Sequence, residues 1–209
     1  MDLGTALLSF AAVGALLTIT PGLDTALVLR SALNGGRRPA FFTAAGICLG
    51  ALTWGAAAAV GVSALLAAST LAYTILRIAG AAYMLWLGAR MLIAARRGHA
   101  AHPSATGTPP QSARSALTRG ALTNLLNPKV GAFYLAVLPQ FIPAGASHLT
   151  AGLLLASVHV AESMLWFTAL ILSAAALNRF LRTRRAQRTV DATTGTALIG
   201  FGLKLGLSR

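Results

Sequence analysis

Cysteine is nearly absent from this 209-residue chain: Cys48 stands alone, so one chain cannot build a disulfide framework or a paired-thiol redox site. Acidic residues are almost as rare, since Asp and Glu number 4 against 17 Lys and Arg, and charged residues make up only 10% of the chain. Three common catalytic motifs are also missing: the phosphate-binding Gly-x-x-x-x-Gly-Lys-Ser/Thr loop, His-Glu-x-x-His and Gly-x-Ser-x-Gly. We therefore expect no ATP hydrolysis by this chain, no cofactor and no bound metal.

Long apolar blocks take the place of charge, and 56% of the residues are hydrophobic. Residues 40–62 contain no charged residue, and as a helix they would extend roughly 35 Å, enough to cross a bilayer. The pattern predicts an all-α, polytopic membrane protein with six transmembrane helices. The predicted spans are residues 3–29, 40–62, 70–93, 115–138, 149–177 and 188–207. The fourth contains Lys129 and the sixth is short and glycine-rich, so models with four or five spans stay open on hydropathy alone.

The positions of the basic residues favour six spans. A net charge of +13 would suggest nucleic-acid binding in a soluble protein, but here the arginines cluster in the connections after the first, third and fifth predicted spans. Because connections rich in Lys and Arg face the cytoplasm, six spans would place both termini on the periplasmic or extracellular side. A model with four or five spans would leave an arginine cluster outside. We expect the lipid bilayer, and no nucleic acid, as a partner.

A polar, proline-containing linker at residues 96–114 separates two halves, residues 1–95 and 115–209. Each half contains Gly-Ala-Leu, at 14–16 and at 120–122, followed within eight residues by a proline. Because three spans per half is an odd number, the second half would enter the membrane from the opposite side. We therefore predict two inverted three-helix repeats.

The first span of each half is interrupted beside a charge, by Thr20-Pro21-Gly22-Leu23-Asp24 in one half and by Asn127-Pro128-Lys129 in the other. A break in a membrane helix frees backbone groups to bind a solute, and ionisable groups at this depth face the protein interior. Paired breaks in two halves are typical of transporters. We predict that Asp24 binds the ammonium group of a zwitterion and Lys129 its carboxylate, and that the two side chains pair when substrate is absent. The predicted substrate site also includes Pro21, Gly22, Asn124, Asn127 and Pro128.

Simpler interpretations of these charges exist. Asp24 could cap the helix that resumes after the break, and Lys129 could extend along its helix to the headgroups.

Glu162 lies near the centre of the fifth predicted span, where removal from water favours the protonated carboxyl. We predict that Glu162, or Asp24, carries a coupling proton. His159 shares a helix face with Glu162, which leaves a divalent-metal exporter using Asp24, His159 and Glu162 as an alternative; a structural hydrogen bond for His159 is the simpler interpretation. An intramembrane enzyme with Glu162 and His159 as acid and base, or a purely structural membrane subunit, are further alternatives.

Several motifs occur in a characteristic order. They are Thr20-Pro21-Gly22-x-Asp24, Gly35 followed by Arg37-Arg38, Gly46-x-x-x-Gly50, Leu76-Arg77-x-x-Gly80-Ala81-x-Tyr83, Asn127-Pro128-Lys129 and Gly195-x-x-x-x-Ile199-Gly200-x-Gly202. In this order they resemble the lysine exporter superfamily, and within it the RhtB-like branch of threonine, homoserine and leucine exporters. The chain departs from the family at Leu23, where a second proline is common.

The resemblance implies a secondary transporter, not an enzyme, that exports amino acids or related small metabolites across the bacterial inner membrane by proton antiport. The spacing of Gly46 and Gly50, and of Gly202 and Gly206, is typical of close helix packing and also compatible with a homodimer.

Overall fold

The computed structural model describes residues 2–68, 70–97 and 112–174, together with positions 189, 192, 196, 199, 200 and 203. Every regular element in this part of the chain is a helix, which confirms the all-α prediction. The elements are α1 (Leu3–Ile19), α2 (Leu23–Gly35), α3 (Arg37–Ala68), α4 (Thr70–Arg97), α5 (Ala113–Leu125), α6 (Pro128–Ala136), the 3-10 helix η1 (Leu138–Phe141) and α7 (His148–Leu172). Most of the predicted linker, and most of the predicted sixth span, lie outside the described residues.

Two segments are long and apolar enough to cross a membrane, Arg37–Gly61 of α3 and His148–Leu172 of α7. The pair α1 and α2 passes the same test as one bent unit. The described helices therefore contain two candidate membrane spans, or three with the bent pair, and the arrangement of six spans in two inverted repeats stays a prediction.

The first predicted break is confirmed, because α1 and α2 meet at an angle of 55° across it. Gly22 is the N-cap of α2, in extended conformation and without a side-chain cap bond. The start of α1 is capped conventionally: the Asp2 carboxylate accepts hydrogen bonds from the Thr5 hydroxyl at 2.7 Å and the Thr5 backbone N–H at 2.9 Å. These bonds hold the pKa of Asp2 below its usual range.

The second predicted break is also confirmed, since α5 ends at Leu125 and α6 begins at Pro128. The side chain of Asn127 caps α6 by accepting a hydrogen bond from the Lys129 backbone N–H at 3.1 Å. Proline suits the first helical position because the N–H that it lacks would have no partner within the helix.

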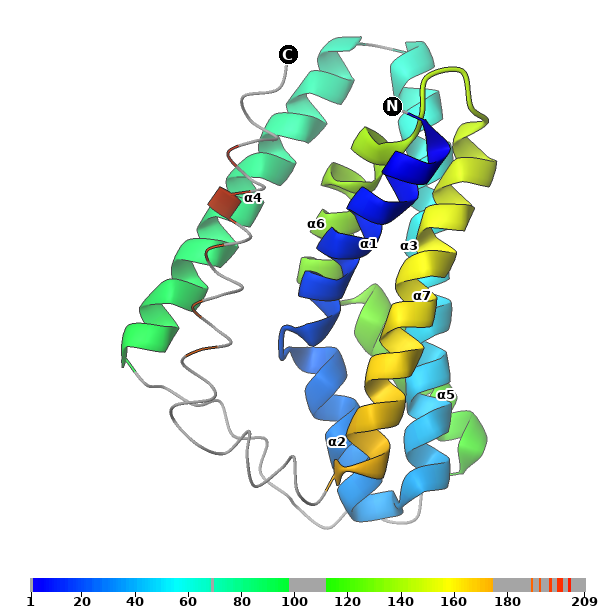
Figure 1. Cartoon of the computed structure of the whole chain (residues 1–209), viewed down its shortest axis with the longest axis vertical. Helices are drawn as coiled ribbons and strands as arrows, with labels where there is room; N and C mark the ends of the chain where they lie inside the picture. Colours follow the sequence, from blue (N-terminus) through cyan, green and yellow to red (C-terminus); the bar gives the residue numbers. More distant parts are fainter. Residues whose placement is uncertain are drawn as a thin grey trace.

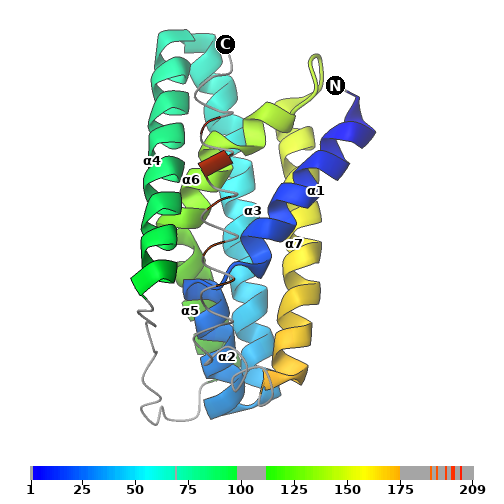
Figure 2. The same cartoon turned by 60° about the vertical axis from the view of Figure 1, so that its left-hand side comes forward.

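Helix α3 runs the length of the bundle and packs most extensively against α5 and then α7 (Figures 1 and 2). Where α3 crosses α5, a Cβ at Gly46 would collide with the Leu117 carbonyl oxygen, and a Cβ at Gly120 with the Thr43 carbonyl oxygen. The two backbones are therefore in direct contact. This contact within the chain explains the glycine at position 46.

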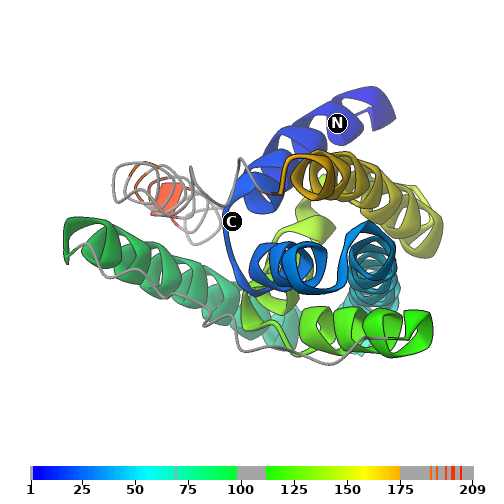
Figure 3. The same cartoon turned by 90° about the horizontal axis from the view of Figure 1, so that it is seen from below.

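Seen from below, α2 lies in the middle of the bundle and α4 along its edge (Figure 3). The C-terminal end of α2, the N-terminal ends of α3 and α5 and the C-terminal end of α7 lie at the lower end of the bundle in Figure 1. Arginines lie in the first turns of α3 and α5 and in the second half of α2: Arg37, Arg38, Arg114 and Arg30.

Two buried apolar clusters stabilise the two ends of the bundle. The upper cluster joins α1, α3, α4, α6, η1 and α7 and has an aromatic centre, with ring centroids of Phe10 5.6 Å from Phe133 and 5.5 Å from Phe141. The lower cluster joins α2, the first half of α3 and the end of α7. Its buried members are Val28, Ala40, Ala44, Ile47, Phe167, Leu170 and Ile171. The two helix breaks lie between these clusters.

Candidate functional site

Both helix breaks line one buried cavity of about 30 Å³. This volume holds roughly one water molecule. Six helices and both breaks contribute to its wall, so segments more than 100 residues apart in sequence meet there. The lining residues are Leu17, Thr18, Thr20, Gly22, Asp24, Thr25, Ile47, Cys48, Ala51, Asn124, Asn127, Lys129, Val130, His159, Ser163 and Phe167. Of the predicted site residues, Gly22, Asp24, Asn124, Asn127 and Lys129 are in this wall, while Pro21 and Pro128 form the breaks beside it.

Asp24 connects the first break to the second. Its Oδ2 accepts a hydrogen bond of 2.9 Å from the Asn124 side-chain amide. Its Oδ1 is buried and has no hydrogen-bond partner among the described residues. Asp24 lies in the first turn of α2, where the helix dipole favours a carboxylate, but the N-cap is Gly22 and no side-chain cap bond is made. One carboxylate oxygen is thus positioned by Asn124 and the other retains acceptor capacity inside the cavity wall.

Lys129 also reaches across to the opposite break. Its Nζ donates hydrogen bonds to the backbone carbonyl oxygens of Leu17 at 3.2 Å and Thr20 at 3.3 Å. The last carbonyls of a helix lack partners within the helix, so the break in α1 supplies these acceptors. The ammonium lies over Gly22, where a Cβ would come within 3.5 Å of Nζ. The side chain is therefore directed into the protein, and the headgroup interpretation of Lys129 is wrong.

The predicted direct pair between Asp24 and Lys129 is not formed in the described part of the chain. Asn124 and two backbone carbonyls take the places that the opposite charges would have taken. The reason is the geometry of the breaks, which offers each charge a neutral partner on the facing element. An ammonium and a carboxylate therefore remain near one cavity without neutralising each other by contact.

Helix α7 contributes one face, with His159, Ser163 and Phe167 spaced four residues apart along the cavity wall. His159 is 4% exposed, and its Nδ1 is 2.8 Å from the Tyr134 hydroxyl. The structural interpretation of His159 is confirmed, although its partner is Tyr134 rather than Glu162.

Glu162 lies outside the cavity wall, on the neighbouring face of α7. A Cβ at Gly14 would lie 2.8 Å from Glu162 Oε2, so this carboxyl rests against the backbone of α1. Oε2 is buried and has no hydrogen-bond partner among the described residues. Thr18, one helical turn after Gly14, does line the cavity. Glu162 is therefore one turn of α1 away from the site and not in it.

No group of three or more His, Cys, Asp or Glu side chains that could hold a metal ion occurs in the described residues. Asp24, His159 and Glu162 thus do not form the ligand set that the metal-export alternative requires.

Several wall residues were not predicted from sequence. Cys48 is a buried thiol in α3, and the hydroxyls of Thr18 and Ser163 are 3.3 Å apart across α1 and α7. The indication that the sequence offers for these wall residues is that they are small and polar inside otherwise apolar spans. Their meeting depends on packing between helices whose residues are 145 positions apart.

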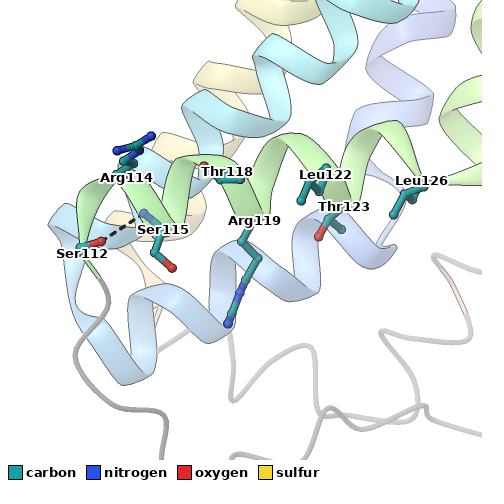
Figure 4. Close-up of a pocket in the computed structure, with 8 residues that line it drawn as sticks. All are labelled: Ser112, Arg114, Ser115, Thr118, Arg119, Leu122, Thr123 and Leu126. Atoms are coloured by element: carbon teal, nitrogen blue, oxygen red, sulfur yellow. Dashed lines mark hydrogen bonds between the residues drawn. The ribbon is translucent and has the colours of Figure 1, made fainter.

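A larger concavity, of about 570 Å³, lies on the surface along α5 (Figure 4). Its described lining comes from α5 and its two cap residues: Ser112, Arg114, Ser115, Thr118, Arg119, Leu122, Thr123 and Leu126. The hydrogen bond drawn there, from the Ser115 backbone N–H to the Ser112 hydroxyl at 3.2 Å, caps the helix. The smaller, buried cavity instead brings together charged groups from two different elements, Asp24 and Lys129, so we take that cavity as the candidate site.

Comparison with known proteins shows a match over nearly the whole chain. The family model described as LysE type translocator matches residues 15–209. The leucine efflux protein of Enterobacter sp. (strain 638) is 32% identical over 192 residues, covering 90% of this chain and 89% of the relative. The threonine efflux protein of Escherichia coli (strain K12) is 27% identical, covering 91% and 92%. A membrane protein of Bacillus subtilis (strain 168) is 28% identical, covering 97% and 99%. No solved structure matches the chain.

Proposed function

Because the chain belongs to the LysE type translocator family, we propose that it exports amino acids, or related small metabolites, through the cavity between its two helix breaks. Membership of this family places it among membrane transporters and not among enzymes. The observation that carries the proposal is the placement of Asp24 and Lys129 on opposite breaks of one buried cavity. The relatives named as leucine and threonine efflux proteins support an amino acid as the solute.

In the proposed complex, the substrate ammonium group binds Asp24 and the substrate carboxylate binds Lys129. The buried Oδ1 of Asp24 has acceptor capacity, and Lys129 can exchange a backbone carbonyl for the stronger charge-assisted bond to a carboxylate. The N-terminal ends of α2 and α6 add partial positive charge beside the carboxylate. Pro21, Gly22, Asn127 and Pro128 hold these helix ends, and Asn124 positions Asp24. A zwitterion would leave the occupied site electrically neutral.

Export requires the cavity to open to each side in turn. At about 30 Å³ it has room for roughly one water molecule, so an amino acid can enter only when helices separate. The lower cluster closes one end of the cavity and the upper cluster the other. We propose that substrate enters past the lower cluster and leaves past the upper one, with the break between α1 and α2 as a hinge.

The orientation follows from the charges at the helix ends. Arginines lie near the lower ends of α2, α3 and α5, and the positive-inside rule would place this end in the cytoplasm. The proposed protein then has six spans in two inverted repeats, residues 1–95 and 115–209, with the linker at 96–114 inside. Both termini are outside the inner membrane of a bacterium.

We further propose that Glu162 takes up the coupling proton, with Asp24 as the other candidate. Glu162 Oε2 is buried without a hydrogen-bond partner in the described part of the chain. The contact with Gly14 puts the carboxyl against the helix that also carries Leu17 and Thr18 into the cavity wall. Protonation there can change the fit of α1 against α7 and so couple a proton to opening.

Replacing Glu162 with glutamine should separate transport from the proton gradient. The amide keeps the shape of the carboxyl but cannot take up or release a proton. In proteoliposomes, an imposed pH gradient should accelerate amino-acid efflux by the wild type but not by Glu162→Gln, while substrate exchange without a gradient continues in both. Asp2→Asn, at an exposed carboxylate, is the control. If the pH gradient accelerated efflux by Glu162→Gln as much as by the wild type, the coupling proton would be assigned to Asp24 instead.

The proposed function itself is tested by efflux from proteoliposomes preloaded with single amino acids or with divalent metal ions. We expect efflux of neutral amino acids such as leucine and threonine, and retention of the metal ions. Efflux of a metal ion with retention of every amino acid would contradict the proposal.

A further inference from the structure

Two hydroxyl groups in the cavity wall take no part in the proposed binding of the substrate charges. Thr18 on α1 is 8% exposed and Ser163 on α7 is 5% exposed. Both line the cavity, and their side-chain oxygens are 3.3 Å apart, with either able to be the donor. They are thus a buried hydroxyl pair within the site and beside its charged groups.

The chemistry of such a pair suits two kinds of neighbour. Each hydroxyl has one donor and two acceptor positions, and a single bond between them uses one proton. The second proton and the remaining lone pairs are available to a hydroxyl on the substrate. When an apolar group lies there instead, the bond between the two hydroxyls persists but the second proton loses its partner, so the apolar group is accepted less well than a hydroxyl.

The position of the pair relates it to the substrate side chain. Thr18 follows Leu17, whose carbonyl oxygen accepts a hydrogen bond from Lys129 Nζ. A substrate carboxylate bound to Lys129 would therefore lie near Leu17, the residue that precedes Thr18 on α1. A hydroxyl on a short substrate side chain is close enough to the carboxylate to meet this pair.

The remaining wall limits other side chains. Ile47, Ala51 and Phe167 are apolar and buried, and His159 is already bonded to Tyr134. Among the described wall residues, Asp24 and Lys129 are the only Asp, Glu, Lys or Arg, and the backbone of the substrate would occupy both. A charge on the side chain of the substrate would therefore be buried without a partner, which is strongly unfavourable.

We propose that Thr18 and Ser163 are specificity-determining residues that discriminate a hydroxyl from a methyl group on the side chain of a short, uncharged amino acid. This inference rests on the proposed function of the same cavity. It adds the part of the site that recognises the side chain, as distinct from the part that binds the two charges.

Threonine and valine provide the test, because they differ only by a hydroxyl in place of a methyl group. Efflux of each is measured from proteoliposomes as kcat/KM for the wild type, for the double variant Thr18→Val with Ser163→Ala, and for Ser163→Ala alone in case the double variant does not fold. One hydrogen bond corresponds to roughly tenfold at most. The wild type should therefore prefer threonine by about two- to tenfold. In the variants the preference should fall toward one through slower threonine efflux, with valine efflux retained.

Two controls separate specificity from structure. Thr53→Val removes an exposed hydroxyl that, among the described residues, bonds only to the Leu49 carbonyl of its own helix, at 2.9 Å, and should leave the preference unchanged. Thr18→Ser keeps a hydroxyl and should also retain it. Equal efflux of threonine and valine by the wild type, an unchanged preference in the variants, or an equal loss of both amino acids with an altered pH dependence would overturn the inference. Failure of the wild type to transport threonine and valine would overturn the inference, and failure to transport every amino acid would overturn the proposed function as well.

Discussion

Replacing Lys129 with methionine should lower kcat/KM for amino-acid export by about ten- to a hundredfold. Methionine keeps an unbranched side chain of similar length but removes the ammonium that bonds to the Leu17 and Thr20 carbonyls. A hydrogen bond to a charged group contributes about 1.5–3 kcal/mol, and each 1.4 kcal/mol is tenfold in affinity. Arg38→Met, which removes an exposed positive charge from α3, should export at the wild-type rate.

The corresponding change on the opposite break, Asp24→Asn, should weaken binding of the substrate ammonium group. Asp24→Asn retains a side chain of the same shape, which can still bond to Asn124, so the fold should persist while the charge is lost. Substrate analogues that lack one of the two charges test whether the site requires both. Isoamylamine and 4-methylpentanoate, which are leucine without its carboxylate and without its ammonium group, should compete poorly for the wild-type site. Competition by either analogue as strong as that of leucine would contradict a zwitterion site.

Adding one methyl group at the crossing of α3 and α5 should destabilise the whole bundle. A Cβ at Gly120 would collide with the Thr43 carbonyl oxygen and lie 3.0 Å from the Ile47 backbone nitrogen. Backbone atoms cannot rotate away as a side chain can, so α3 and α5 must separate and move Asn124 away from Asp24. Overpacking of this kind costs about 1–3 kcal/mol or more. In a protein of this size the melting temperature should fall by roughly 2–12 °C.

The control for Gly120→Ala is Gly61→Ala, since an added Cβ at Gly61 meets nothing within 4 Å. Alanine favours a helix over glycine by up to about 1 kcal/mol, so this variant should melt at or above the wild-type temperature. Thermal unfolding of both purified variants in detergent is the measurement. If Gly120→Ala melted and exported like the wild type, the direct backbone contact between α3 and α5 would be wrong.

The helix breaks could be predicted from sequence because proline and glycine act on the backbone locally. Pro21 with Gly22, and Asn127 with Pro128, interrupt their helices whatever lies around them. The charges beside the breaks were expected to converge because ionisable groups at membrane depth face the interior. These arguments need no knowledge of how the helices pack.

The partners of those charges could not be predicted in the same way. Which group Lys129 bonds to depends on the angle at which α1 ends, and the bond from Asn124 to Asp24 depends on the rotation of α5. That rotation is set by the contact of α5 with α3 at Gly46 and Gly120. Similarly, its depth in α7 made Glu162 a candidate, but only packing shows that its face of the helix meets Gly14 and not the cavity.

Occupancy of the cavity between the two breaks by an amino acid can be tested directly at Cys48. It is the single cysteine of the chain, it lines the cavity, and it is 5% exposed. The rate at which N-ethylmaleimide alkylates purified protein, followed by intact mass, therefore reports on access to this cavity alone. A transported amino acid at ten times its Kd should slow alkylation of the wild type by roughly tenfold, and should give little protection to Lys129→Met. Alkylation of Cys48 at the same rate with and without an amino acid that the protein exports would contradict the account.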